Sequence, residues 1–156
     1  MFGLFKSKSV VIVSPTDGEL ISIERVNDKV FSQKMVGDGV AIIPSSDNFL
    51  APLDGEITKL FPTLHAYSLR HKSGVEVIVH IGLDTVSLAG EGFEAFVSEG
   101  DQVKAGDLLI KADIEKIKAL GKDIVTPIVI TQMQKYKSIK KYLGFLKSNE
   151  VIMEVK

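Results

Sequence analysis

The sequence predicts an all-β protein, an antiparallel β-sandwich or flattened barrel with a few short helices. Three observations predict this class. Short runs of β-branched and aliphatic residues recur along the chain, turn residues interrupt them at short intervals, and helical spacing of apolar residues is sparse. Many short strands separated by glycine, proline and aspartate turns are typical of sandwiches and barrels.

Each expected strand is an apolar run that ends at a turn signal. The run at 10–13 stops at Ser-Pro-Thr-Asp-Gly, and the strongest run, at 75–81, precedes a series of Glu-Gly and Gly-Asp turns. The other expected strands are 20–23, 40–43, 108–110, 124–130 and 151–155.

Helical spacing is clear at one place. Ile114, Ile117 and Leu120 fall on one face of a helix over 113–120, and Gly121 is a suitable residue to end it. Residues 85–88 are expected to form a short turn, and residues 135–143 either a helix or a loop.

Composition indicates an ordinary globular protein. The chain has 156 residues, of which 45% are hydrophobic and 25% charged, with a net charge of −1 and no cysteine. The absence of cysteine excludes disulfides and thiolate metal sites. The net charge near zero gives no general attraction to nucleic acid. We expect a flexible N-terminal tail over 1–9 and a single domain over 10–156, in a cytoplasmic protein.

His80 interrupts the strongest apolar run. Strand alternation places it on the face that it shares with Ile78, opposite Val77 and Val79. An imidazole beside such a run is partly desolvated, which keeps it neutral and able to act as a nucleophile. At Gly82, the missing side chain would let another backbone segment or a phosphate approach.

A hairpin can bring a second histidine to His80. A turn centred between positions 72 and 73 would place His65 directly opposite His80, with Cβ atoms about 4.5–5.5 Å apart. Thr63 and Tyr67 would share that face with His65. A slip of the turn centre by one residue would instead pair His80 with Tyr67.

A histidine pair supports two kinds of chemistry. It supplies half of the four ligands of a usual zinc site. It can also carry out phosphoryl transfer, in which one imidazole attacks phosphorus and the other donates a hydrogen bond or positive charge to the phosphoryl oxygens. The remaining histidine, His71, lies in a polar turn and is expected to have no direct role.

The residues around His80 also carry a family resemblance. The segment Gly-Val-Glu-Val-Ile-Val-His-Ile-Gly-Leu-Asp-Thr-Val at 74–86 is similar to the signature around the phosphorylated histidine of glucose-type enzyme IIA domains. These domains belong to the phosphoenolpyruvate-dependent sugar phosphotransferase system. Further similar blocks lie at 28–31, 37–42, 51–55, 61–66, 90–93 and 103–107.

The resemblance implies a phosphoryl carrier that needs no cofactor. His80 would accept the phosphoryl group on Nε2 from a phosphohistidine of the small carrier protein HPr and pass it to a cysteine of a IIB domain. His65 would contact the phosphoryl group, and Thr63 would orient His65. Permeases and kinases that such domains regulate are implied as further partners, and the protein would meet the membrane only through its permease.

The resemblance also implies a docking surface around His80. An apolar ring would exclude water while a partner brings its own reactive side chain to the histidine. Two carboxylates on the rim would face basic groups of HPr. The ring positions are Val30, Phe31, Phe61, Ile78 and Val86, and the rim carboxylates are Asp28 and Asp84.

Three other functions match parts of the pattern. A zinc metallohydrolase of related β-architecture needs a His-x-His pair, which the sequence lacks, although a zinc ion could still bind between His65 and His80. The turns at 99–107 are similar to those of swinging-arm carrier domains, but no lysine here has the sequence context of the modified lysine in such domains. A purely regulatory binding protein would use the same apolar ring, and the sequence does not separate it from a carrier.

Overall fold

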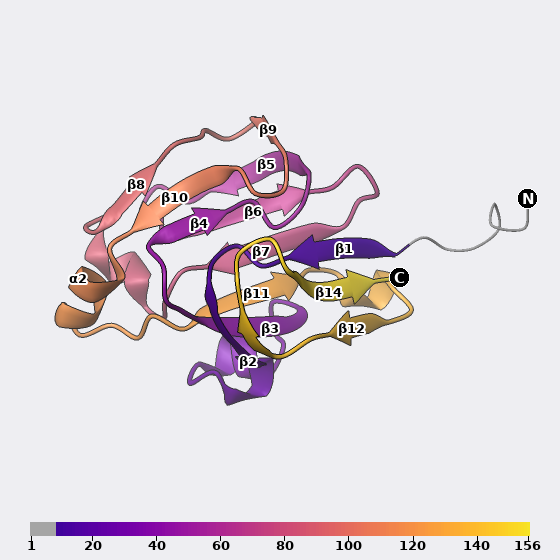
Figure 1. The fold of residues 1–156 in the computed structure, drawn as a ribbon, viewed down its shortest axis with the longest axis horizontal. Helices are drawn as coiled ribbons and strands as arrows, with labels where there is room; N and C mark the ends of the chain where they lie inside the picture. The colour runs from indigo at the N-terminus through magenta and orange to yellow at the C-terminus, as the bar shows by residue number, and fades with distance from the viewer. Residues whose placement is uncertain (1–8) are drawn as a thin grey trace, which may run out of the picture.

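The computed structural model describes residues 9–156, which form three antiparallel sheets (Figure 1). Within these residues the eight-stranded sheet stays open, with β13 at one edge and β9 at the other, so the antiparallel all-β prediction is confirmed without a closed barrel. In spatial order its strands are β13 (Gly144–Leu146), β2 (Gly18–Ser22), β3 (Asp38–Pro44), β11 (Thr126–Ile130), β7 (Glu76–His80), β6 (Ala66–Arg70), β5 (Gly55–Leu60) and β9 (Gln102–Val103).

Two three-stranded sheets complete the fold. All the apolar runs expected to be strands are strands, with small shifts at their ends. One sheet consists of β1 (Val10–Val13), β14 (Val151–Val155) and β12 (Ile139–Lys141), and the other of β4 (Asn48–Leu50), β10 (Leu108–Ala112) and β8 (Phe93–Ala95).

The helices are short, and α2 (Ile114–Ala119) is the one that the sequence predicts. Asp113 caps it by accepting a hydrogen bond from Lys116 N at 3.1 Å, and Gly121 follows its end with a φ of +87°. The prediction of a helix or loop over 135–143 is wrong, because β12 lies there and pairs with β14. The other helical elements within residues 9–156 are α1 (Lys29–Ser32) and the 3₁₀ turns η2 (Ile23–Arg25), η3 (Thr85–Leu88) and η4 (Met133–Lys135).

Strand alternation sorts the buried side chains into two clusters. Val79 of β7 joins the main core, to which all three sheets contribute. Ile78, its neighbour on the opposite face, packs with Val129 against a second cluster. The segment between β2 and β3 covers this second face, and its Phe31 is buried there. His80 ends β7 on the same face as Ile78, as the sequence predicts.

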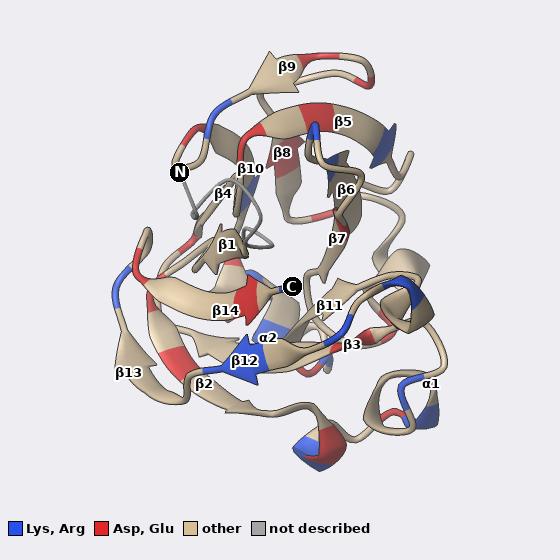
Figure 2. Cartoon of the chain, turned by 90° about the vertical axis from the view of Figure 1, so that its right-hand side faces the viewer, with Lys and Arg blue, Asp and Glu red and all other residues tan. Residues whose placement is uncertain are grey.

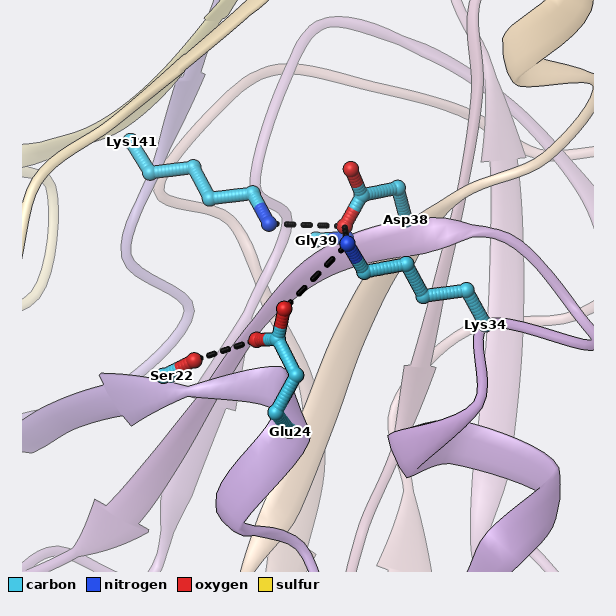
Figure 3. A network of polar contacts seen from close by, with 6 residues as sticks. All are labelled: Ser22, Glu24, Lys34, Asp38, Gly39 and Lys141. Carbon is cyan, nitrogen blue, oxygen red and sulfur yellow. Dashed lines mark hydrogen bonds and ion pairs between the residues drawn. The ribbon is translucent and has the colours of Figure 1, made fainter.

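A polar network holds the covering segment in place (Figure 3). Lys34 Nζ lies 3.2 Å from Glu24 Oε2 and 3.8 Å from Asp38 Oδ1. Lys141 Nζ, from β12, lies 2.7 Å from the same Asp38 oxygen. A hydrogen bond from Ser22 is the main cause that lowers the pKa of Glu24 to about 2, with a further contribution from Lys34. The network therefore ties both ends of the covering segment to the sheet.

Charges of both signs are distributed over the strands and loops (Figure 2). None of the helices among the described residues combines the length and apolar character needed to cross a membrane. The expected tail at 1–9 falls almost entirely on residues 1–8, which lie outside the described residues.

Candidate functional site

β6 and β7 form the predicted hairpin, but in a register one residue away from the prediction. His80 pairs with Ala66, whereas the prediction places His65 opposite it. The turn contains three residues, 72–74, and ends in Gly74 with a φ of +96°. Glycine adopts this left-handed conformation readily, which favours an odd-numbered turn over one centred between positions 72 and 73.

His65 reaches His80 because it lies in the turn before β6 rather than in a strand. Leu64 has a φ of +61°, and the His65 carbonyl accepts a hydrogen bond from Ile81 N at 2.7 Å. The two imidazole centroids are 4.9 Å apart, with ring planes at 81°. Tyr67 does not share this face as predicted, because it lies within β6, where alternation points it into the main core.

One backbone carbonyl determines the tautomer of His80. His80 Nδ1 lies 2.7 Å from Gly82 O, and a carbonyl only accepts, so Nδ1 carries the proton. In the neutral ring the lone pair is therefore on Nε2. Burial lowers the pKa of His80 below 6.5, although the Gly82 carbonyl and the Asp28 carboxylate oppose this shift. The result is a neutral imidazole with a nucleophilic Nε2.

Gly82 has no room for a side chain. Its φ is +78°, and a Cβ there would lie 2.6 Å from Thr85 Cγ2 and 2.8 Å from Asp123 O. The expected close approach of another backbone segment is therefore confirmed. The orienting role of its carbonyl was not predicted, because the direction of a carbonyl depends on the loop conformation.

His65 is the more deeply buried histidine of the pair. Its side chain is 3% exposed, and its Nδ1 lies 2.6 Å from Thr63 Oγ1. Burial, followed by the nearby His80, lowers the pKa of His65 to about 4. The ring is therefore neutral at physiological pH. The threonine hydroxyl can donate to Nδ1, and Nε2 then carries the proton.

One aromatic ring packs against each histidine of the pair. The Phe31 centroid lies 5.0 Å from that of His80, and the Phe61 centroid 5.3 Å from that of His65. Lys59 Nζ lies 5.4 Å from the Phe61 centroid, within cation–π range. Lys59 was not predicted to lie at the site, although its position two residues before Phe61 in an extended chain puts both side chains on one face.

The other predicted ring residues differ in exposure. Val30 and Val86 are 43% and 52% exposed, Phe61 is half-buried, and Ile78 packs against the second cluster. Phe31 is only 6% exposed, so its ring packs against His80 as part of the protein interior and offers little apolar surface to a partner.

Both predicted rim carboxylates already have partners within the chain. Asp28 caps α1, where its Oδ1 accepts a hydrogen bond from Val30 N at 2.9 Å. Asp84 Oδ2 lies 2.7 Å from Lys122 Nζ. Asp84 remains largely exposed at the edge of the site, and its side chain has a second oxygen for another partner.

No group of three or more His, Cys, Asp or Glu side chains within residues 9–156 could hold a metal ion. A zinc ion between His65 and His80 would need ligands from water or another protein. Zinc binding at the pair stays a prediction.

Comparisons with known proteins identify the family of the chain. Residues 10–136 match the family model for the phosphoenolpyruvate-dependent sugar phosphotransferase system, EIIA 1. The glucose-specific EIIA component of Bacillus cereus is 49% identical over 145 residues, 92% of this chain and 88% of that protein. The glucose-specific EIICBA component of Streptococcus pneumoniae is 45% identical over 136 residues, 87% of this chain and 19% of that protein.

The fold is likewise that of a solved relative. Glucose permease IIA from Mycoplasma capricolum superposes with a TM-score of 0.90 at 39% identity, covering 96% of this chain and 97% of that one. Fold, histidine pair and similarities together define a component of a sugar phosphotransferase system. Within that class the chain belongs to the EIIA 1 family, which confirms the resemblance seen in the sequence.

Proposed function

We propose that His80 is the phosphoryl carrier of this EIIA component. The hydrogen bond from His80 Nδ1 to Gly82 O carries the proposal, because it leaves the Nε2 lone pair as the nucleophile. In the first step, the N–P bond of phosphohistidine in HPr breaks as the Nε2–P bond forms. In the second step, the thiolate of a cysteine in a IIB domain attacks phosphorus, so that an S–P bond forms as the Nε2–P bond breaks and Nε2 regains its lone pair.

His65 assists by donating a hydrogen bond. With Nδ1 accepting from the Thr63 hydroxyl, the neutral ring has its proton on Nε2 and can donate it to a phosphoryl oxygen. The short distance between the two imidazole rings supports this role. Thr63 thus acts by orienting His65.

Each partner brings its own reactive side chain to the histidine pair. The exposed Val30 and Val86 offer apolar contact, and Asp28 and Asp84 offer negative charge for basic groups of HPr. A IIB partner is supported by the Streptococcus pneumoniae relative, in which a similar EIIA segment is part of an EIICBA polypeptide. We assign these encounters to the cytoplasm, consistent with a chain that has no cysteine.

The proposal is tested by incubating the protein with phosphoenolpyruvate, enzyme I and HPr and measuring its intact mass. We expect one acid-labile phosphoryl group on the wild type and on His71→Gln, and none on His80→Gln. His65→Gln is expected to accept the group but to transfer it slowly to a IIB domain. Phosphorylation of His80→Gln would contradict the carrier role, and normal sugar phosphorylation with His65→Gln would contradict the role of His65.

A further inference from the structure

The loop that carries the Gly82 carbonyl is tied to the connection between α2 and β11. Leu83 N donates a hydrogen bond to Asp123 O at 2.9 Å, and Lys122 Nζ lies 2.7 Å from Asp84 Oδ2. The Asp123 carbonyl oxygen also lies only 2.8 Å from the place that a Cβ on Gly82 would take, so the two backbones pack closely against each other. The loop residues 82–84 therefore contact Lys122 and Asp123 of the connection.

The connection is itself held at both ends. Gly121 follows α2 in a left-handed conformation, and its N–H donates to Lys118 O at 2.9 Å. On the other side, Asp123 Oδ1 accepts a hydrogen bond from Val125 N at 2.9 Å, and the buried Thr126 begins β11. This anchoring lets the connection act as a fixed support for the loop.

The loop needs such support because Asp84 has a φ of +56°. A residue other than glycine persists in this left-handed region where surrounding contacts hold it. The Lys122 side chain is 23% exposed, whereas that of Asp84 is 70% exposed. The lysine is therefore the better-packed member of the pair and can restrain the aspartate.

We propose that Lys122 is a positioning residue for His80. Its ion pair with Asp84 holds the Gly82 carbonyl against His80 Nδ1 and so keeps Nε2 unprotonated. The consequence for phosphoryl transfer rests on the proposed function of His80. The tautomer itself does not, because it can be measured in unphosphorylated protein without any partner.

The test compares Lys122→Met, Lys122→Arg and Lys118→Met. Lys118 is a matched control, because it pairs with Glu115 at 3.3 Å on α2, away from the loop. Two quantities are measured by NMR: the ¹⁵N shifts of His80 Nδ1 and Nε2, which report the tautomer, and the hydrogen exchange rate of the Leu83 amide. In Lys122→Met we expect about two- to five-fold faster exchange and a similar fall in the tautomer equilibrium constant, as for loss of one partly exposed ion pair.

Lys122→Arg keeps the charge and should retain wild-type values, as should Lys118→Met. Asp84→Asn removes the same pair from the other side and should reproduce the tautomer shift even if Lys122→Met folds poorly. With phospho-HPr, Lys122→Met should lower kcat in proportion to the fall in the fraction of His80 that is protonated on Nδ1. An unchanged tautomer and unchanged Leu83 exchange would overturn the proposal, even with a higher KM, because Lys122 would then act only on docking. A tautomer shift in a protein whose wild type accepts no phosphoryl group would support the role of Lys122 and refute only the carrier function.

Discussion

The burial of His65 predicts how the stability of the protein depends on pH. The pKa of His65 is about 4 in the folded protein, against an ordinary value of 6.5. Between these values the unfolded chain binds a proton that the folded protein does not. The free energy of unfolding therefore falls as the pH falls from 6.5 to 4. Above this window His65 is neutral in both states, and below it the loss is complete.

The size of the effect follows from the pKa difference. The interval from 6.5 to about 4, at about 1.4 kcal/mol per pH unit, corresponds to about 3 kcal/mol of stability. His80 adds to the loss in the same direction, because burial also lowers its pKa. Glu24 acts in a separate window: its pKa is about 2 against an ordinary 4.5, so its contribution is lost only below pH 4.5.

Urea unfolding followed by far-ultraviolet circular dichroism at pH 7, 6, 5 and 4 measures the effect. His65→Gln should lose about 3 kcal/mol less than the wild type between pH 7 and 4, whatever its stability at pH 7. His71→Gln serves as the control, because His71 lies next to the 72–74 turn, at the end of the β6–β7 hairpin away from His80. An equal loss of stability in His65→Gln and wild type would show that the protonation of His65 does not cause the loss of unfolding free energy between pH 7 and 4.

Three further substitutions test the support of the site. Gly82→Ala should lower the free energy of unfolding, measured by chemical denaturation, by more than about 1 kcal/mol. The loss should exceed that of Gly100→Ala, because Gly100 has a similar φ but open space around it. Equal losses would mean that the loop at Gly82 adjusts to the added methyl group. Thr63→Val should slow phosphoryl transfer to a IIB domain about two- to ten-fold, which corresponds to the net free energy of one hydrogen bond. Thr63→Ser should retain the wild-type rate. Equal rates in the wild type and both variants would refute the orienting role of Thr63. Phe31→Ala should cost about 3–5 kcal/mol of unfolding free energy, whereas Phe145→Ala, at an 84% exposed position, should change it by under about 0.5 kcal/mol.

Features that depend on local periodicity were predictable from the sequence. A period of two is enough to separate Val79 from Ile78, because neighbouring side chains in a strand must point to opposite faces. The helix α2 was predictable as well, since Asp113 and Gly121 satisfy its ends within a few residues.

Features that depend on distant contacts or on single dihedral angles were not predictable. β12 is a strand because β14 pairs with it, and nothing within 135–143 indicates that partner. The hairpin register was decided by the conformation of Gly74, and the approach of His65 by a left-handed Leu64. Alternation therefore predicted that His65 and His80 lie close together, but it did so from an incorrect register. The proposed roles of HPr and a IIB domain rest on the family resemblance, because residue spacing does not indicate a direction of transfer.

The two imidazoles are chemically alike, and what distinguishes them is the group that each Nδ1 meets. A carbonyl can only accept, so Gly82 forces the proton of His80 onto Nδ1 and leaves Nε2 as a nucleophile. A hydroxyl can donate, so Thr63 allows His65 the opposite tautomer, with its proton on Nε2. Both rings must be neutral for this difference to exist, and burial, which lowers both pKa values, provides that condition. A protonated His80 would have no lone pair, and two rings in the same tautomer would supply two nucleophiles or two donors but not one of each. The apolar enclosure and the two polar contacts are therefore parts of one requirement, because neither produces an unlike pair of histidines without the other.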